Sequence, residues 1–303
     1  MTLHLPHLHP RQRVAWLRGW VRQTELGLIL LAALVGVASG LLAVAIGAVA
    51  RFMHVAIYGA EAAHGLSSIR GASPWLLLLM PALGGLLLGG LNRLLARIRP
   101  RVPIDPVEAN ALHGGRLSVN DGVVVVAQNL VSNGFGASVG LEAGYTQIAG
   151  GVASRLGRLF SLRRGDLRVL VGCGAAGAIS AAFDAPLTGT FYAFELVVGI
   201  YSIATLAPVV TAAVTALLVT RAIRGENLVL AVGNADGADL QGYTLALVLG
   251  LICGLAGIAL MRGVTLTEQW LRRGVPWPNL RPFAGGLVVG ALALVTPGVL
   301  SAG

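Results

Sequence analysis

Charged residues are scarce in this chain of 303 residues, and lysine is missing altogether. Only 12% of the residues are charged, against about 25% in an average soluble domain, and all 22 basic residues are arginines. Hydrophobic residues make up 55% of the sequence, and the mean hydropathy is +0.78. A soluble globule of this composition could not cover its outside with polar groups. The scarcity of charge therefore argues against a soluble enzyme and predicts a protein embedded in membrane lipid.

Cysteines and acidic residues are also few, which removes further classes of function. Cys173 and Cys253 lie in apolar, glycine-rich stretches, so we expect small core residues rather than a disulfide framework or a metal set. The net charge of +9 would suggest nucleic acid in a soluble protein. Here the arginines lie in short segments between apolar runs, as membrane orientation requires. We therefore expect no enzyme activity, no metal, no cofactor and no nucleic-acid partner.

The apolar runs indicate an all-α polytopic membrane protein. Residues 26–50 and 74–95 are each long enough to cross a hydrocarbon core of about 30 Å as a helix. The later runs are shorter and are interrupted by Gly, Asn, Gln or Ser; they cover residues 123–139, 141–156, 168–183, 186–201, 203–219, 245–261 and 283–295. Transporters use short, broken and re-entrant helices of this kind where a helix stops midway to line a cavity.

Glycines spaced four residues apart predict close packing between helices rather than a ligand site. Four such pairs occur: Gly36 and Gly40, Gly85 and Gly89, Gly250 and Gly254, and Gly286 and Gly290.

The distribution of arginine predicts the orientation. Four regions are rich in arginine: the N-terminal tail and residues 97–116, 158–168 and 262–281. Residues 226–243 contain no arginine and carry three of the 13 acidic residues. The positive-inside rule places the four basic regions in the cytoplasm. We expect the protein to lie in the inner (plasma) membrane of the cell. We divide the chain into a basic tail (1–25), a first membrane half (26–224), an external loop (225–242) and the start of a second half (243–303).

Three carboxylates, Glu142, Asp184 and Glu195, lie within the apolar part, where ionisable groups are costly and usually functional. Glycines flank Glu142 and an apolar stretch follows, which favours a loop that leads into a helix N-terminus. The unpaired N–H groups and the dipole of such an end attract anions. Glu142 could occupy this position and leave when an inorganic anion replaces it, or it could be an ordinary first-turn acid that caps the helix.

Two segments resemble the CLC chloride channel and transporter family. Residues 140–150 read GLEAGYTQIAG, which is similar to the family signature G-[KR]-E-G-P-x-x-Q-I-G-G, with the gating glutamate at Glu142. Residues 174–195 read GAAGAISAAFDAPLTGTFYAFE and resemble the family's G-A-A-A-G-x-A-A-A-F-N-A-P-L-A-G-x-x-F-x-x-E, which ends at Glu195. The resemblance extends more weakly over nearly the whole chain.

This resemblance implies a bundle of two inverted halves, and a homodimer with much of its contact in residues 186–219. It implies transport of chloride or another small inorganic anion, with Glu142 as the gate. Glu195 and Asp184 fall on a possible proton pathway. The anion-binding positions implied around the gate and in the first anion loop are Gly140, Leu141, Ala143, Gly144, Pro103, Ile104 and Asp105.

The departures from the family are as informative as the matches. The first anion loop, G-S-G-I-P in the family, reads VPIDP at residues 102–106, so Pro103, which has no N–H donor, replaces the serine. Leu141 replaces a basic residue and Gly144 a proline, while Asp184 replaces an asparagine. Leu196 stands where proton-coupled members carry a second glutamate, which favours anion movement that is channel-like or weakly coupled to protons.

The second half of the family pattern is incomplete. Residues 296–303 resemble the beginning of the second half's counterpart to the first anion loop, and no G-x-F-x-P loop or late anion-binding tyrosine follows. We expect either a truncated gene or a fragment of a longer protein. Two alternatives to channel-like transport remain: a membrane protein that does not transport, and an anion–proton antiporter when full length.

Overall fold

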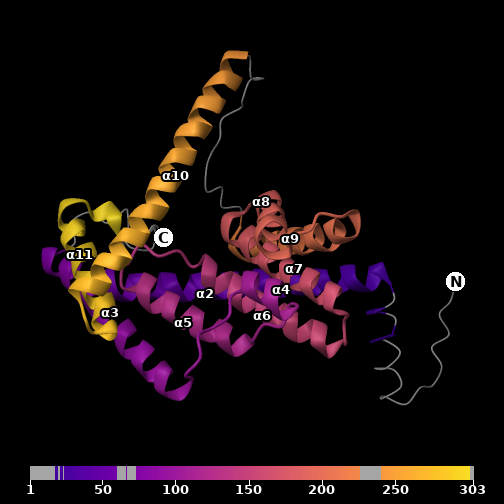
Figure 1. The fold of residues 1–303 in the computed structure, drawn as a ribbon, viewed down its shortest axis with the longest axis horizontal. Coiled ribbons are helices and arrows are strands. Elements are labelled where there is room, and N and C mark those ends of the chain that lie inside the picture. The colour runs from indigo at the N-terminus through magenta and orange to yellow at the C-terminus, as the bar shows by residue number, and fades with distance from the viewer. Residues whose placement is uncertain are drawn as a thin grey trace.

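Every regular element that the computed structural model describes is a helix (Figure 1), which confirms the all-α prediction. The structure describes residues 18, 19, 21, 22, 24–59, 66, 73–225 and 240–300. Within these, six helical segments are long and apolar enough to cross a membrane: α2 (Glu25–Tyr58), α3 (Pro74–Ile98), α7 (Arg164–Phe183), α9 (Ile203–Arg224), most of α10 (Leu240–Gly274), and the segment Pro278–Val295, which contains η4 (Pro278–Leu280) and α11 (Arg281–Val295).

Shorter helices lie between the spans, as the interrupted apolar runs predict. They are α4 (Pro106–His113), α5 (Val119–Gly134), α6 (Glu142–Leu159), α8 (Pro186–Tyr192), the π-helical turn η3 (Ala193–Val198) and the 3₁₀ turn η5 (Pro297–Val299). The single segment predicted over residues 186–201 is thus divided in two. The expectation of short segments is wrong for four of the later runs, 168–183, 203–219, 245–261 and 283–295. Each lies within a longer helical segment that could span a membrane, namely α7, α9, α10 and Pro278–Val295.

Side-chain caps explain where several helices begin. Thr24 Oγ1 accepts a hydrogen bond of 3.1 Å from the Gly27 N–H at the start of α2, and Ser118 caps α5. Ser202 and Thr205 form a reciprocal capping box at the start of α9. Each cap satisfies backbone N–H groups that lack a partner in the first turn of a helix. Both α6 and α7 begin without any side-chain cap.

Helix α7 lies in the core, packed against α2, α6, α8 and α9. Small residues allow this close packing: a Cβ added at Gly174 would lie 2.7 Å from the Ala149 carbonyl oxygen of α6. Cys173, also on α7, is fully buried, as predicted. The prediction is wrong for Cys253, which is exposed on α10.

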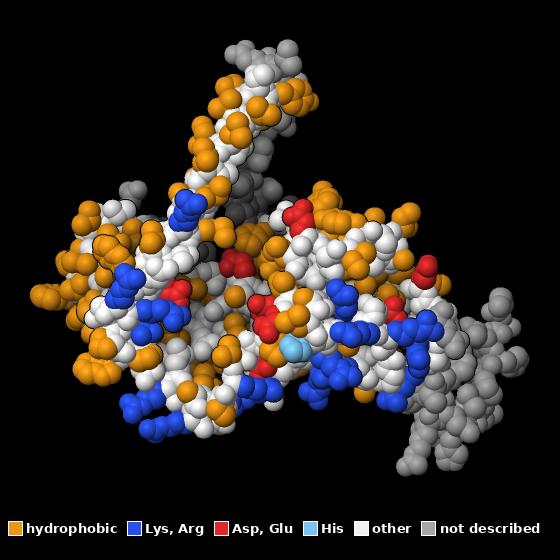
Figure 2. Space-filling view, in the orientation of Figure 1, with side chains coloured by type: hydrophobic (Ala, Val, Ile, Leu, Met, Phe, Trp, Pro, Cys, Tyr) orange, Lys and Arg blue, Asp and Glu red, His pale blue; other side chains and the backbone are white. Residues whose placement is uncertain are grey.

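Three of the four predicted glycine pairs lie at contacts between helices. Gly36 and Gly40 face the backbone of α9, Gly286 and Gly290 face that of α3, and Gly85 and Gly89 face α11 and η4. The prediction is wrong for Gly250 and Gly254 on α10, where no atom lies within 4 Å of an added Cβ. Helix α10 extends away from the other helices (Figure 1), and hydrophobic side chains lie along much of the face that Figure 2 shows. Gly250 and Gly254 therefore meet no other helix among the described residues.

Two predicted segments lie mostly outside the described residues. They are the basic tail at 1–25 and the external loop at 225–242.

Candidate anion site at the start of α6

The first turn of α6 offers backbone N–H groups to a ligand. The helix begins at Glu142, and its N-cap residue, Leu141, has no side-chain acceptor. The first internal hydrogen bond runs from the Tyr145 N–H to the Leu141 carbonyl, at 2.9 Å. The N–H groups before Tyr145, on Glu142, Ala143 and Gly144, have no acceptor within the helix, and they lie at the positive end of its dipole. This arrangement suits an anion.

The Glu142 carboxylate folds back over Gly140. A Cβ added at Gly140 would collide with Oε2 of Glu142, so a side chain there would displace the carboxylate. Glu142 is half-buried and makes no ion pair with any described residue. The positive end of the α6 dipole favours its negative charge at this helix N-terminus.

Helix α5 supplies a further hydrogen-bond donor beside this turn. Gly144 is buried, and a Cβ added there would lie 3.1 Å from Nδ2 of Asn129. The Asn129 Nδ2 group is buried and has no hydrogen-bond partner among the described residues. A buried amide donor without a partner is costly, so an acceptor bound here would stabilise the site.

The loop at residues 102–106 lies beside α6. Gln147, on α6, donates a hydrogen bond of 2.5 Å from Nε2 to the carbonyl oxygen of Ile104. The Asp105 carboxylate caps α4 by accepting from the Glu108 N–H at 2.7 Å, and Pro103 has no N–H. The side chains of this loop thus offer no donor to an anion, so the donors described here come from α5 and α6.

A tyrosine lies near both the loop at residues 102–106 and the start of α6. Tyr192, at the end of α8, reaches the side chain of Thr146 and lies close enough to Asp105 and Glu142 to sense both charges. Tyr192 is not among the site residues that the sequence predicted. It falls within the segment 174–195 that resembles the family, but the sequence pattern does not show that the end of α8 lies close to the start of α6.

Two arginines that no sequence pattern pointed to provide positive charge near Tyr145, in the second turn of α6. Tyr145, one turn into α6, lies within electrostatic range of Arg224, Arg51 and Glu142. Arg224 donates hydrogen bonds from Nη2 to the carbonyl oxygens of residues 43 and 44, at 2.9 and 3.2 Å. Its guanidinium group occupies the space that a side chain at Gly47 would need. Positive charge therefore comes from α2 and α9, although the basic residue of the family signature is replaced by Leu141.

The other two predicted carboxylates lie elsewhere. Asp184 ends α7 in the left-handed conformation, with φ of 54°, and pairs with Arg221 of α9 through two hydrogen bonds of 2.9 and 2.7 Å. These bonds hold the pKa of the Asp184 carboxyl below its ordinary value. Glu195 is exposed in η3, and its side chain makes no hydrogen bond or ion pair with a described residue; Leu196 beside it is exposed as well.

Fold and site together define a polytopic α-helical membrane protein with an uncapped helix N-terminus at a break between two short helices. The chain belongs to the voltage gated chloride channel family, whose model matches residues 84–303. It is 35% identical to a ClcB-like chloride channel protein of Ralstonia nicotianae, over 90% of this chain and 64% of that protein. It is 30% identical to the voltage-gated ClC-type chloride channel ClcB of Salmonella typhimurium, over 89% of this chain and 66% of that protein.

Two solved structures share the fold. One is a slow cyanobacterial Cl⁻/H⁺ antiporter, with a TM-score of 0.74, 21% identity, and coverage of 98% of this chain and 66% of that chain. The other is a CLC-type fluoride/proton antiporter, with a TM-score of 0.70, 24% identity, and coverage of 89% and 65%. These likenesses confirm the CLC-type helical bundle predicted from the sequence. The chain spans about two thirds of the length of the proteins it matches.

Proposed function

We propose that this protein moves chloride, or another small inorganic anion, across the membrane, with Glu142 as the gate. The observation that carries the proposal is the Glu142 carboxylate, which lies over Gly140 at a helix N-terminus that no side chain caps. An anion that takes the place of the carboxylate would meet the unpaired N–H groups of the first turn and the positive end of the dipole. Such groups bind an anion strongly enough for entry and weakly enough for release.

The residues around the gate support this function. Gly140, Leu141, Ala143 and Gly144 form the turn that presents the N–H groups, and Asn129 adds an amide donor. Arg51 and Arg224 raise the local concentration of anions by electrostatic attraction. In our proposal, Pro103, Ile104 and Asp105 shape the access to the site rather than bind the anion.

Chloride efflux from liposomes tests the proposal. The chain would be reconstituted as it is, and also extended at its C-terminus by the remaining sequence of the Ralstonia relative. We expect selective, saturable chloride efflux from the extended chain, and little from the 303-residue chain. Absence of anion efflux from both, at verified incorporation, would contradict the proposed function and favour a membrane protein that does not transport.

We further propose that transport proceeds without stoichiometric movement of protons. Leu196 cannot carry a proton, and the exposed Glu195 points about 80–100° away around its helix. Asp184 is held by Arg221 and remains ionised, so it cannot easily relay a proton. A chloride gradient that drives protons uphill through the extended chain would show that the protein is an antiporter instead.

An exposed apolar surface supports a homodimer. It is formed by α8, η3 and α9 and includes large side chains that are 47–90% exposed: Leu187, Phe191, Leu196, Ile203, Leu206 and Leu218. An apolar surface of this kind is typical of a contact with protein or lipid. Cross-linking of single cysteines on this surface in native membranes should produce dimers, whereas cysteines on α10 should not.

We propose the inner membrane as the location, with the arginine-rich ends in the cytoplasm. A single cysteine at position 163 should react with an impermeant thiol reagent only after permeabilisation, and one at position 236 without it. The opposite pattern would reverse the orientation.

A further inference from the structure

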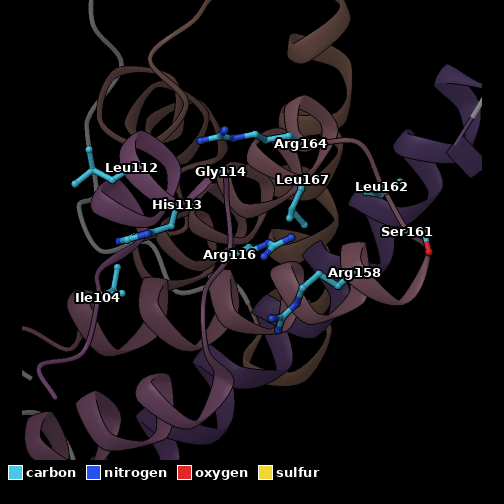
Figure 3. A pocket seen from close by; sticks show the side chains of 10 residues that line it. All are labelled: Ile104, Leu112, His113, Gly114, Arg116, Arg158, Ser161, Leu162, Arg164 and Leu167. Atoms are coloured by element: carbon cyan, nitrogen blue, oxygen red, sulfur yellow. The ribbon is translucent and has the colours of Figure 1, made fainter. Parts of the chain in front are cut away.

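A basic cavity lies among the end of α4, the end of α6 and the start of α7, separate from the gate. Its volume is about 710 Å³, which falls within the range of small-molecule sites. Three arginines line it, and they come from three different elements (Figure 3): Arg116 from the loop after α4, Arg158 from α6 and Arg164 from α7. No carboxylate lines the cavity.

The backbone around these arginines is fixed in place. Ser154, which is fully buried in α6, accepts from the Leu117 N–H at 2.9 Å and donates to the Gly115 carbonyl at 2.8 Å. These two bonds clamp the backbone on both sides of Arg116. The cavity is therefore preformed, which lowers the entropic cost of binding a ligand.

Two of the arginines are oriented by their surroundings. Arg158 donates to the carbonyl oxygens of Ser154 and Leu117, at 3.3 and 3.5 Å. The Arg164 side chain lies across Gly114, where a Cβ would collide with it. Gly114 has a φ of +60°, a conformation that glycine adopts without strain. The turn that ends α4 thus leaves room for Arg164 to reach the cavity.

The positive charge of the cavity is not neutralised by nearby acids. Asp121 pairs with Arg99 and Arg101, and Glu108 lies 3.9 Å from His113. The side chains of Arg116 and Arg164 make no hydrogen bond or ion pair with any residue that the structure describes. A neighbouring cavity of about 460 Å³ shares Arg116 and Arg158; its lining adds Arg101 and Arg155 and one carboxylate, that of Asp121. Figure 2 shows basic side chains gathered over this part of the molecule.

We infer that this cavity binds a phosphate group, carried either by an anionic lipid or by a soluble phosphate compound. Guanidinium groups from several directions match the oxygens of a phosphate and bind it through charge-assisted, paired hydrogen bonds. Basic pockets between membrane helices on the cytoplasmic side are suited to anionic lipid head groups. Leu112 and Leu162 also line the cavity, and Leu112 is 68% exposed, so an acyl chain could lie beside the bound head group.

Binding measurements on the purified 303-residue chain in detergent test the inference. The probes are short-chain phosphatidylglycerol, short-chain phosphatidylcholine and inorganic phosphate. The variant Arg116→Gln/Arg158→Gln/Arg164→Gln removes the three cavity charges. The control Arg93→Gln/Arg97→Gln/Arg262→Gln removes three exposed charges outside the cavity.

We expect the cavity variant to bind phosphatidylglycerol or inorganic phosphate at least about tenfold more weakly than the wild type, and the control to remain within about twofold. Binding of phosphatidylglycerol alone identifies a lipid site, and binding of inorganic phosphate identifies a soluble ligand. If the triple variant does not fold, Arg116→Gln/Arg164→Gln keeps the Arg158 bonds and should still weaken binding several-fold. Equal losses in the cavity and control variants, or no binding of either probe to the wild type, would overturn the inference.

Discussion

The start of α6 and the end of α7 are both breaks between helices that carry a carboxylate, yet they hold it in different ways. At the end of α7, Arg221 binds both oxygens of Asp184. At the start of α6, Glu142 has no basic partner within ion-pair distance among the described residues and lies over a glycine. A carboxylate fixed by two charge-assisted hydrogen bonds joins helices, because moving it would break both bonds. A carboxylate at a helix N-terminus that has no such partner can exchange with another anion.

The largest effect on stability should follow removal of the Asp184 carboxylate, which Arg221 holds in place. Asp184→Ala removes both hydrogen bonds to Arg221 and should lower the free energy of unfolding by about 1–3 kcal/mol. Chemical unfolding in detergent micelles measures this change. Glu142→Ala is the matched control and should lower it by less than about 0.5 kcal/mol, since no ion pair is lost. Equal losses in the two variants would show that Glu142 is a structural cap, for which about 0.5–2 kcal/mol is expected.

Acid should also weaken the ion pair between Asp184 and Arg221 at the end of α7. The pKa of Asp184 is lowered in the folded protein because Arg221 binds the ionised form. The stability that this pair contributes is therefore present above the unfolded pKa of about 3.9 and is lost as the pH falls through the lower folded value. The difference in unfolding free energy between wild type and Asp184→Asn should shrink below about pH 4. A difference that stays constant down to pH 2 would contradict this assignment.

A side chain added at Gly140 should displace the Glu142 carboxylate. In Gly140→Ala, the added Cβ takes the place of Oε2 of Glu142, so the carboxylate must shift from its position over residue 140. We expect chloride efflux from the extended chain to lose part of its dependence on external pH. Gly165→Ala is the control, because no atom lies within 4 Å of a Cβ added there. Unchanged pH dependence in Gly140→Ala would show that the carboxylate does not gate from this position.

A smaller effect is expected from the arginine near the gate. Arg224→Gln keeps a hydrogen-bond donor toward the carbonyls of residues 43 and 44 but removes the charge near Tyr145. The chloride concentration for half-maximal efflux should rise about two- to fivefold at low salt, and less at high salt because ions screen the field. Arg273→Gln, exposed at the end of α10, should leave it unchanged.

The sequence predicted those parts of the fold and site that depend on local patterns. Glycines on both sides of Glu142 located the start of α6 to within one residue, and the long apolar runs located α2 and α3. Contacts between distant residues left no local signal. The pairing of Asp184 with Arg221 joins residues 37 positions apart, and the approach of Arg224 to Gly47 joins α9 to α2.

Spacing patterns also failed where a pattern had no partner to pack against. Gly250 and Gly254 have the same spacing as Gly36 and Gly40, but only the second pair meets another helix among the described residues. The spacing permits a close approach and does not create one. In the same way, the sequence indicated that proline at position 103 replaces a serine donor of the family. Only the structure showed that Asn129 offers an amide donor near the start of α6.

The dependence of chloride efflux on external pH, in wild type and in Glu142→Gln, tests the gate most directly. Glutamine keeps the shape of the side chain and removes its charge, so it imitates the protonated gate. At matched incorporation of the extended chain, we expect the Glu142→Gln variant to keep its efflux and to lose most of the pH dependence that the wild type shows. Two pH profiles that superimpose would show that Glu142 is not the gate.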